Sequence, residues 1–366
     1  MREDLLRAMG GLYKSLVADF TLLDDGRPVA TSAVIGADAV SLAPDAVRAI
    51  GWELKLQGLC HGETCIPVRP EHGLQRPDGI DLAALATMLD RPLALDLAER
   101  VAALGASAAE RGARLRSLDA PDFVLPDLDG HLHSLSEQRG RKVLLHAWAS
   151  WCGCRHDLPF WQALHAELRD GGFTVISVAL DQSADAARSW IEAAAPTHPA
   201  LIDTEHRVAD LYWMINVPTV VWIDERGRIV RPNDAAFGSD AFVDLHHRPA
   251  QPHLDAVRAW VREGRLPFAD DDAVRAHQVL PTREEQQARA EFALAWYLHR
   301  AGRREAAERH FARADALAPH DFTIRRGSMP IRGRDPMGAD FVPLFQEWIE
   351  AGTPYYGPMA PATKPD

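Results

Sequence analysis

The chain has 366 residues, of which 47% are hydrophobic and 25% are charged, so its length predicts two or three soluble domains with real cores rather than a disordered chain. The 52 acidic residues outnumber the 40 basic ones and give a net charge of -12, which argues against a nucleic-acid partner. Apolar runs such as residues 142–145 are far too short to cross a bilayer, so no membrane partner is expected.

The four cysteines form two close pairs, Cys60 with Cys65 and Cys152 with Cys154. The first residues lack an apolar stretch and a small-residue cleavage site, which predicts no signal peptide and a cytoplasmic location. In the cytoplasm thiols are kept reduced, so paired cysteines there favour redox or metal chemistry over structural stapling.

Residues 1–118 are predicted to form a small α+β domain. Asp81 is a plausible N-cap for a helix over 81–89, where apolar residues recur at helical spacing. The other expected elements are strands at 28–35, 52–56, 93–97 and 101–104, a hairpin within 59–68, and a linker at 111–116.

Residues 119–265 alternate strands and helices, which predicts an α/β domain. The apolar run 143–149 suits a strand buried on both faces. The expected order is a βαβ unit followed by an antiparallel hairpin, with helices at 154–170 and 184–195 and strands at 143–149, 173–180, 201–202, 220–223 and 228–230.

Residues 280–352 are predicted to be helical, with helices at 283–300 and 303–317, and residues 353–366 to form a disordered tail. The helical pair resembles one tetratricopeptide repeat, carried by Leu294, Ala295, Gly302, Ala307, Phe311, Ala314 and Pro319. A single repeat builds no solenoid groove, which favours a hairpin packed on its own chain over a module that binds a protein partner.

Cys152 and Cys154 stand where the buried strand meets the following helix. The positive end of a helix dipole and its unpaired N–H groups favour thiolate over thiol, and the thiolate is the reactive species. Arg155 adds positive charge to the same loop. The placement therefore predicts reactive rather than inert cysteines.

Several motifs in this region resemble the thioredoxin superfamily, closest to the TlpA/ResA-type and redoxin (AhpC/TSA-like) thiol-disulfide oxidoreductases. They are the hairpin sequence 120–130, the approach 148–152, Pro159 at the position of a helix-kinking proline, the Val217-Pro218-Thr219 motif and the closing hairpin 223–229. The resemblance implies a thioredoxin-like fold and thiol-disulfide exchange without a cofactor.

The resemblance also implies roles for individual residues. Cys152 would be the nucleophile and Cys154 the resolving thiol. Val217, Pro218 and Thr219 would present a backbone edge to the substrate, which is a protein or small-molecule disulfide, while the electron donor stays unidentified. Trp148 and Trp151 would either give apolar contact beside the thiolate or belong to the core.

The motif departs from the family pattern because one residue, not two, separates the cysteines. Positions i and i+2 of a helix point roughly 200° apart, so a Cys152–Cys154 disulfide requires non-helical backbone, which Gly153 can supply. Cys60 and Cys65 flank four residues, and a hairpin there would place them opposite each other within disulfide range. They are either a second redox pair or a local clip.

Two competing functions remain open. A peroxidase would use the same thiolate, but the positions that carry proline and a hydroxyl in peroxiredoxins are Leu145 and Ala149 here. A non-enzymatic thiol module would bind a partner or a metal through Cys152, Cys154 and His156, or through residues 60–65. Neither cluster offers the four ligands of a structural zinc site, so no metal is expected.

Overall fold

The computed structural model describes residues 16–37 and 39–352, and the chain divides into two compact units. The first unit comprises residues up to 108 together with 282–317, and the second comprises 109–281 together with the chain from 318 onward. The predicted helical region 280–352 is thus shared between the units, with the division at 317/318. The predicted tail, 353–366, lies outside the described residues.

The first unit is built on a seven-stranded sheet. Its order is β7 (Gln75–Arg76), β8 (Gly79–Asp81), β3 (Val40–Leu42), β2 (Arg27–Ile35), β1 (Leu16–Asp24), β10 (Val101–Leu104) and β9 (Leu93–Asp96). Only β1 and β10 pair in parallel; the other neighbours are antiparallel. The predicted strands at 28–35, 93–97 and 101–104 are therefore confirmed within a residue or two.

Helices α2 (Pro44–Ala49) and α3 (Leu82–Met88) also belong to this unit. Asp81 caps α3 as predicted, because its carboxylate accepts a hydrogen bond from the Ala84 amide at 2.7 Å. A separate three-stranded sheet holds β4 (Glu53–Lys55), β5 (Gly58–His61) and β6 (Thr64–Ile66), so the predicted hairpin at 59–68 is present.

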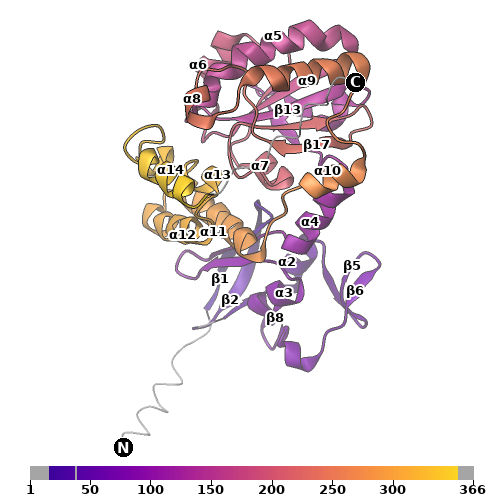
Figure 1. Cartoon of the computed structure of the whole chain (residues 1–366). Helices are drawn as coiled ribbons and strands as arrows, with labels where there is room; N and C mark the ends of the chain where they lie inside the picture. The colour runs from indigo at the N-terminus through magenta and orange to yellow at the C-terminus, as the bar shows by residue number, and fades with distance from the viewer. Residues whose placement is uncertain (1–15, 38, 353–366) are drawn as a thin grey trace, which may run out of the picture. The chain divides into compact units, whose positions relative to one another are not determined.

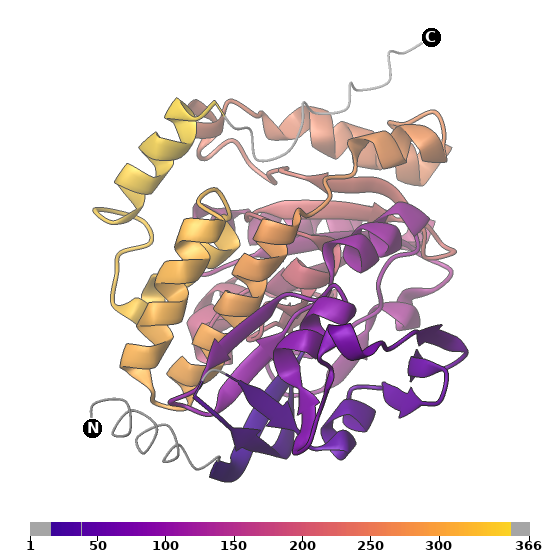
Figure 2. The same cartoon turned by 90° about the horizontal axis from the view of Figure 1, so that it is seen from below.

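Helices α11 (Arg283–Arg300) and α12 (Arg304–Leu317) form the predicted hairpin and lie side by side (Figure 2). The turn between them contains Gly302 at φ +77°, a conformation that favours glycine. The side chain of Gln287 on α11 donates a hydrogen bond to the Leu93 carbonyl on β9, so the hairpin packs on the sheet of its own unit. Its tetratricopeptide identity stays a prediction.

The second unit contains a five-stranded mixed sheet, in the order β15 (Ala200–Ile202), β14 (Phe173–Ala179), β13 (Lys142–Trp148), β16 (Thr219–Ile223) and β17 (Ile229–Asp234). The three strands β13, β14 and β15 run parallel, and β16 and β17 add the predicted antiparallel hairpin. Two short strands, β11 (Val124–Pro126) and β12 (Leu132–Ser134), form the hairpin predicted near 120–130.

Helices cover both faces of this sheet because side chains alternate along β13. Leu144 packs in one core with Trp161, Trp222 and Trp260, under α5 (Leu158–Leu168) and α9 (Ala250–Glu263). Val143, Leu145 and Ala147 pack in the other core, with residues of α6 (Ala184–Ala194), α7 (Arg207–Tyr212) and α10 (Asp271–His277). Figure 1 shows α5 and α9 together on one face and α7 and α10 on the other. This is the thioredoxin-like arrangement that the sequence predicts.

One local prediction is wrong. The expected linker at 111–116 is helix α4 (Ala108–Ser117), because the fully buried Leu115 anchors a segment that Gly112 would otherwise weaken. The helical segment predicted over 154–170 is confirmed, and it consists of a 3₁₀ helix (Gly153–Asp157), α5 and a closing 3₁₀ turn (Arg169–Gly171). Pro159 lies in the first turn of α5, where its missing N–H costs nothing, so it starts the α-helix rather than kinking one.

The short helices α8 (Val243–His246), α13 (Phe322–Arg325) and α14 (Phe341–Glu350) complete the second unit and were not predicted individually. Within residues 16–37 and 39–352, no helix is both long and apolar enough to cross a membrane.

Candidate active site

The loop after β13 places Cys152 at the start of the 3₁₀ helix. Ser150 is held by Asp181, whose carboxylate accepts hydrogen bonds from the Ser150 amide at 2.9 Å and from its hydroxyl at 2.6 Å. Cys152 is the N-cap residue with extended backbone (φ -110°, ψ 146°), and its sulfur accepts a hydrogen bond from the Cys154 amide at 3.3 Å. We expected Gly153 to supply the non-helical backbone between the two cysteines. In the structure Cys152 has the non-helical backbone, and Gly153 is the first residue of the 3₁₀ helix.

Both thiols are free and buried: Cys152 is 5% exposed and Cys154 is 3% exposed. Gly153 between them lies under the ring of Phe242, because an added Cβ would come within 2.8 Å of that ring. A side chain at position 153 would thus require Phe242 to move.

The two cysteines are electrostatically unequal. Burial acts to raise the pKa of Cys152, but the hydrogen bond from the Cys154 thiol and the positive charge of Arg326 outweigh it and lower that pKa to about 7. Burial, together with the hydrogen bond to Cys152, raises the pKa of Cys154 well above its usual value. Cys152 therefore loses its proton more readily than Cys154, which stabilises the Cys152 thiolate as a hydrogen-bond donor.

A buried carboxylate opposes this arrangement. Asp157 ends the 3₁₀ helix, is 3% exposed and accepts a hydrogen bond from the Ser239 hydroxyl at 2.5 Å. Burial raises the pKa of Asp157, and its negative charge acts to raise the pKa of both thiols. The low pKa of Cys152 therefore depends on the groups that stabilise negative charge on its sulfur.

The cation beside Cys152 is not the one that the sequence suggests. The guanidinium of Arg155 lies 4.6 Å from the Trp190 ring centroid and donates a hydrogen bond to the Ser150 carbonyl at 2.6 Å. Arg326, far away in the sequence, supplies the charge that acts on Cys152 instead. No local motif marks Arg326, so the sequence analysis missed it.

The Val217-Pro218-Thr219 segment meets the cysteine loop as predicted. The Val217–Pro218 peptide bond is cis. The Cys152 thiol donates a hydrogen bond to the Val217 carbonyl at 3.4 Å. Thr219 is fully buried, and its hydroxyl donates a hydrogen bond to the Asn216 carbonyl at 2.7 Å. In this structure the Val217 backbone, rather than the Thr219 side chain, faces the reactive sulfur.

The two predicted tryptophans lie in the same hydrophobic core as the cysteines. Trp148 is fully buried at the end of β13. Trp151 is 5% exposed, and its indole N–H donates a hydrogen bond to the Leu180 carbonyl at 3.0 Å. Of the two open alternatives, the observed burial favours the core role for Trp148.

The second cysteine pair lies in the first unit. Cys60 on β5 and Cys65 on β6 face each other in the strand register and form a disulfide with their Cα atoms 4.0 Å apart. Cys60 is buried and Cys65 is exposed. The predicted hairpin geometry is confirmed, whereas exchange with Cys152 stays a prediction.

Among the described residues, the one group of three side chains with metal-ligating atoms close together is Asp127, Asp129 and His131, at the turn between β11 and β12. Their ligand atoms lie within 4.8 Å of one another, but Asp129 and His131 are exposed. The thiol–histidine clusters considered from the sequence do not form such a group there.

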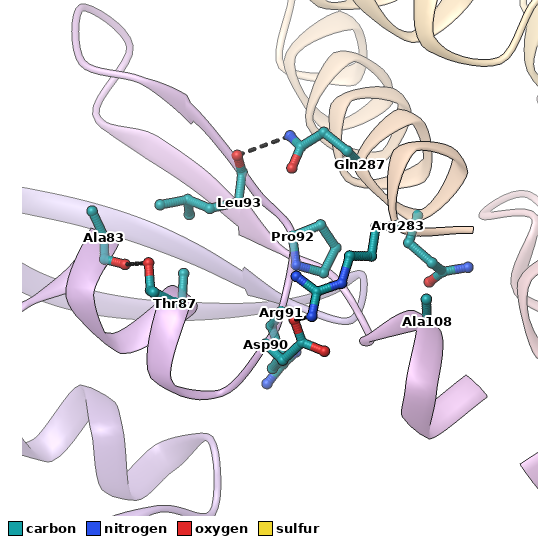
Figure 3. A pocket seen from close by; sticks show the side chains of 11 residues that line it. Ala83, Thr87, Asp90, Arg91, Pro92, Leu93, Ala108, Arg283 and Gln287 are labelled. Atoms are coloured by element: carbon teal, nitrogen blue, oxygen red, sulfur yellow. Dashed lines mark hydrogen bonds and ion pairs between the residues drawn. The ribbon is translucent and has the colours of Figure 1, made fainter. Parts of the chain in front are cut away.

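A hollow of about 410 Å³ lies in the first unit, and no cysteine lines it (Figure 3). Asp90 and Arg283 form an ion pair at 2.7 Å in its wall, and Thr87 donates a hydrogen bond to the Ala83 carbonyl at 2.9 Å. Its lining contains no thiol or imidazole, so it offers no group for redox chemistry.

Comparison with known proteins agrees with the geometry of the second unit. Residues 117–231 match the AhpC/TSA family. The thiol-disulfide oxidoreductase ResA of Geobacillus kaustophilus (strain HTA426) is 33% identical over 111 residues, covering 30% of this chain and 64% of that protein. ResA of Bacillus subtilis (strain 168) is 29% identical over 114 residues, covering 31% of this chain and 64% of that protein.

A solved structure of a thiol:disulfide interchange protein from Bacteroides sp. is 23% identical, with a TM-score of 0.33, covering 40% of this chain and 91% of that chain. The chain spans 64% of the length of the two curated relatives. The matched region contains Cys152, Cys154 and Pro218 but not Arg326, Cys60 or Cys65.

Proposed function

We propose that the second unit catalyses thiol-disulfide exchange, with Cys152 as the nucleophile and Cys154 as the resolving thiol. The observation that carries the proposal is the asymmetry of the pair. The Cys152 sulfur accepts the Cys154 amide hydrogen bond at the start of a helix and has a pKa of about 7, while that of Cys154 is raised. The similarity to ResA over about 30% of the chain supports the same chemistry.

The exchange takes place in two steps. The Cys152 thiolate attacks one sulfur of the substrate disulfide, so a mixed disulfide forms and the other substrate sulfur leaves as a thiolate that takes up a proton. Cys154 then loses its proton and attacks the Cys152 sulfur, which forms the Cys152–Cys154 disulfide and releases the second substrate thiol. The substrate gains two electrons, and an external thiol reductant must return them to the pair.

The backbone at Val217 is well placed for the substrate chain. Its carbonyl already contacts the Cys152 sulfur at 3.4 Å, so an extended peptide disulfide that pairs with this edge would bring its sulfur to the nucleophile. This supports a protein or peptide disulfide as the substrate, with a small disulfide as a simpler alternative that uses the same sulfur.

The test is reduction of a small aromatic disulfide in the presence of a dithiol reductant. Cys152→Ser is expected to abolish turnover. In a parallel reaction without reductant, Cys154→Ser is expected to stop after one reaction of each molecule, because it traps a mixed disulfide that mass spectrometry detects on Cys152. The matched control is the double variant Cys60→Ser/Cys65→Ser, which is expected to retain turnover. Full multiple turnover by Cys152→Ser would refute the proposal.

No observation at the site favours a peroxidase. Leu145 and Ala149, which replace the proline and the hydroxyl of peroxiredoxins, are both fully buried apolar residues of the core. Hydrogen peroxide as the oxidant in the same assay is therefore expected to give much slower turnover than the disulfide.

A further inference from the structure

The start of helix α13 is hydrogen-bonded to the backbone just before the cis-proline motif. The Phe322 amide donates a hydrogen bond to the Ile215 carbonyl at 2.8 Å, and the Thr323 hydroxyl donates to the Met214 carbonyl at 3.3 Å. Both acceptors lie shortly before Val217, whose carbonyl contacts the Cys152 sulfur. Helix α13 is therefore fixed beside the active-site loop, although it lies outside the matched region 117–231.

Arg326 follows directly after α13 and is 6% exposed. Its guanidinium lies 3.7 Å from the Phe341 ring centroid and 5.6 Å from that of Trp151, the residue next to Cys152. Its Nε donates a hydrogen bond to the Pro336 carbonyl at 2.7 Å, and its Nη2 donates to the Met337 sulfur at 2.9 Å. Aromatic rings, a carbonyl and a thioether thus hold a buried cation in one place.

Every one of these partners is neutral, and within the part of the chain that the structure describes no carboxylate pairs with Arg326. A buried guanidinium without an anion is costly, because burial removes the water that stabilises its charge. The neutral contacts fix its position but do not neutralise it. A group beside Arg326 that can carry a negative charge is the sulfur of Cys152, the residue next to Trp151 in the chain.

We propose that Arg326 is the counter-charge of the Cys152 thiolate, supplied to the active site by the segment that follows the helical hairpin. The proposal rests on the proposed function only in taking Cys152 as the reactive thiol. Three charged or titratable groups act on that sulfur. Arg326 and the Cys154 thiol stabilise its negative charge, and Asp157 opposes it.

The test measures the ionisation of Cys152 without any turnover. The rate of alkylation by iodoacetamide is followed from pH 5 to 10, and fragment-ion mass spectrometry separates Cys152 from Cys154. Arg326→Met removes the charge and keeps an unbranched apolar side chain. It is expected to raise the midpoint for Cys152 by about one pH unit, and so to lower its thiolate fraction about tenfold at pH 6.

Two further variants separate charge from structure. Arg326→Lys keeps the charge but loses the planar donor fork, so its midpoint is expected to stay closer to the wild type than to Arg326→Met. Arg325→Gln removes the neighbouring cation, which forms an ion pair with Glu347. This variant is expected to leave the midpoint of Cys152 alkylation unchanged.

An unchanged midpoint in Arg326→Met, or equal shifts in the methionine and lysine variants, would overturn the proposal. If Arg326→Met fails to fold, Arg326→Lys alone decides the test. A midpoint of Cys152 alkylation about one pH unit above the wild type in Arg326→Lys, which keeps the charge, would contradict a role for that charge. Failure of the proposed function gives a different result from failure of this proposal. The midpoints of Cys152 alkylation would then shift as expected in the Arg326 variants, yet the wild type would reduce no disulfide.

Discussion

The buried imidazole of His146 should make the second unit sensitive to acid. His146 lies in the centre of β13, is fully buried and packs against Trp161 with ring centroids 5.1 Å apart. Neither of its ring nitrogens has a hydrogen-bond partner among the described residues. Burial, helped by the nearby His198, lowers the pKa of His146 to about 3, so the folded protein holds it neutral.

The size of the effect follows from the two pKa values. An unfolded histidine titrates near 6.5, and protonation of that state alone draws the equilibrium toward unfolding. Stability is therefore fully present above pH 6.5 and is lost progressively as the pH falls toward 3. At pH 5 the unfolded side chain is almost fully charged and the folded one almost fully neutral, which costs about 2 kcal/mol relative to pH 8.

The substitution that isolates this loss is His146→Leu, which keeps a similar volume and cannot titrate. Urea unfolding at pH 8 and pH 5, followed by tryptophan fluorescence, gives the acid-induced loss for each protein. The variant is expected to lose about 2 kcal/mol less than the wild type. A buried group that does not interact with His146, such as Asp203, contributes to both proteins and cancels in this comparison.

At pH 8 the variant should be at least as stable as the wild type, because it removes buried polar atoms that have no partner. The matched control is His277→Leu, which removes an imidazole at an exposed position of the same unit. Equal losses in His146→Leu and wild type would refute the reasoning and show that the imidazole is charged or hydrated in the folded protein.

Three further outcomes are expected. At pH 7 about half of Cys152 is thiolate, against about 1% for an ordinary cysteine. A thiolate of lower pKa is intrinsically less nucleophilic, but this offsets only part of the difference in thiolate fraction, so Cys152 should alkylate at least about fivefold faster than Cys154. Faster alkylation of Cys154 would contradict the assigned roles. Digestion without reductant should yield one peptide pair joined through Cys60 and Cys65, and finding either bonded to Cys152 would contradict the hairpin register. Asp81→Ala should lower the free energy of unfolding by about 1 kcal/mol in urea titrations followed by circular dichroism, because the N-cap of α3 is lost.

Local sequence determined much of this molecule. The apolar run in β13, the cysteines after it and the proline that starts α5 specify a strand, a loop and a helix with a thiol at the helix start. Cys60 and Cys65 face each other because four residues suffice to reverse the chain between them. Asp81 caps its helix for the same reason: the carboxylate and the amide that it binds are three residues apart. Each of these features depends on neighbours in the sequence, whose preferences can be read directly.

Other features exist only because distant segments pack together. The residues around 111–116 look like a linker, yet the buried Leu115 makes them helical. The helical region that looks continuous in the sequence is divided at 317/318, because its first part packs with the first unit and the chain after it with the second. Arg155 is the cation nearest to the cysteines in the sequence, but Arg326 is the one whose charge acts on Cys152. Periodicity and spacing describe what a segment prefers by itself, whereas these outcomes depend on which buried surfaces meet, and only the folded chain brings a solitary cation to a thiol.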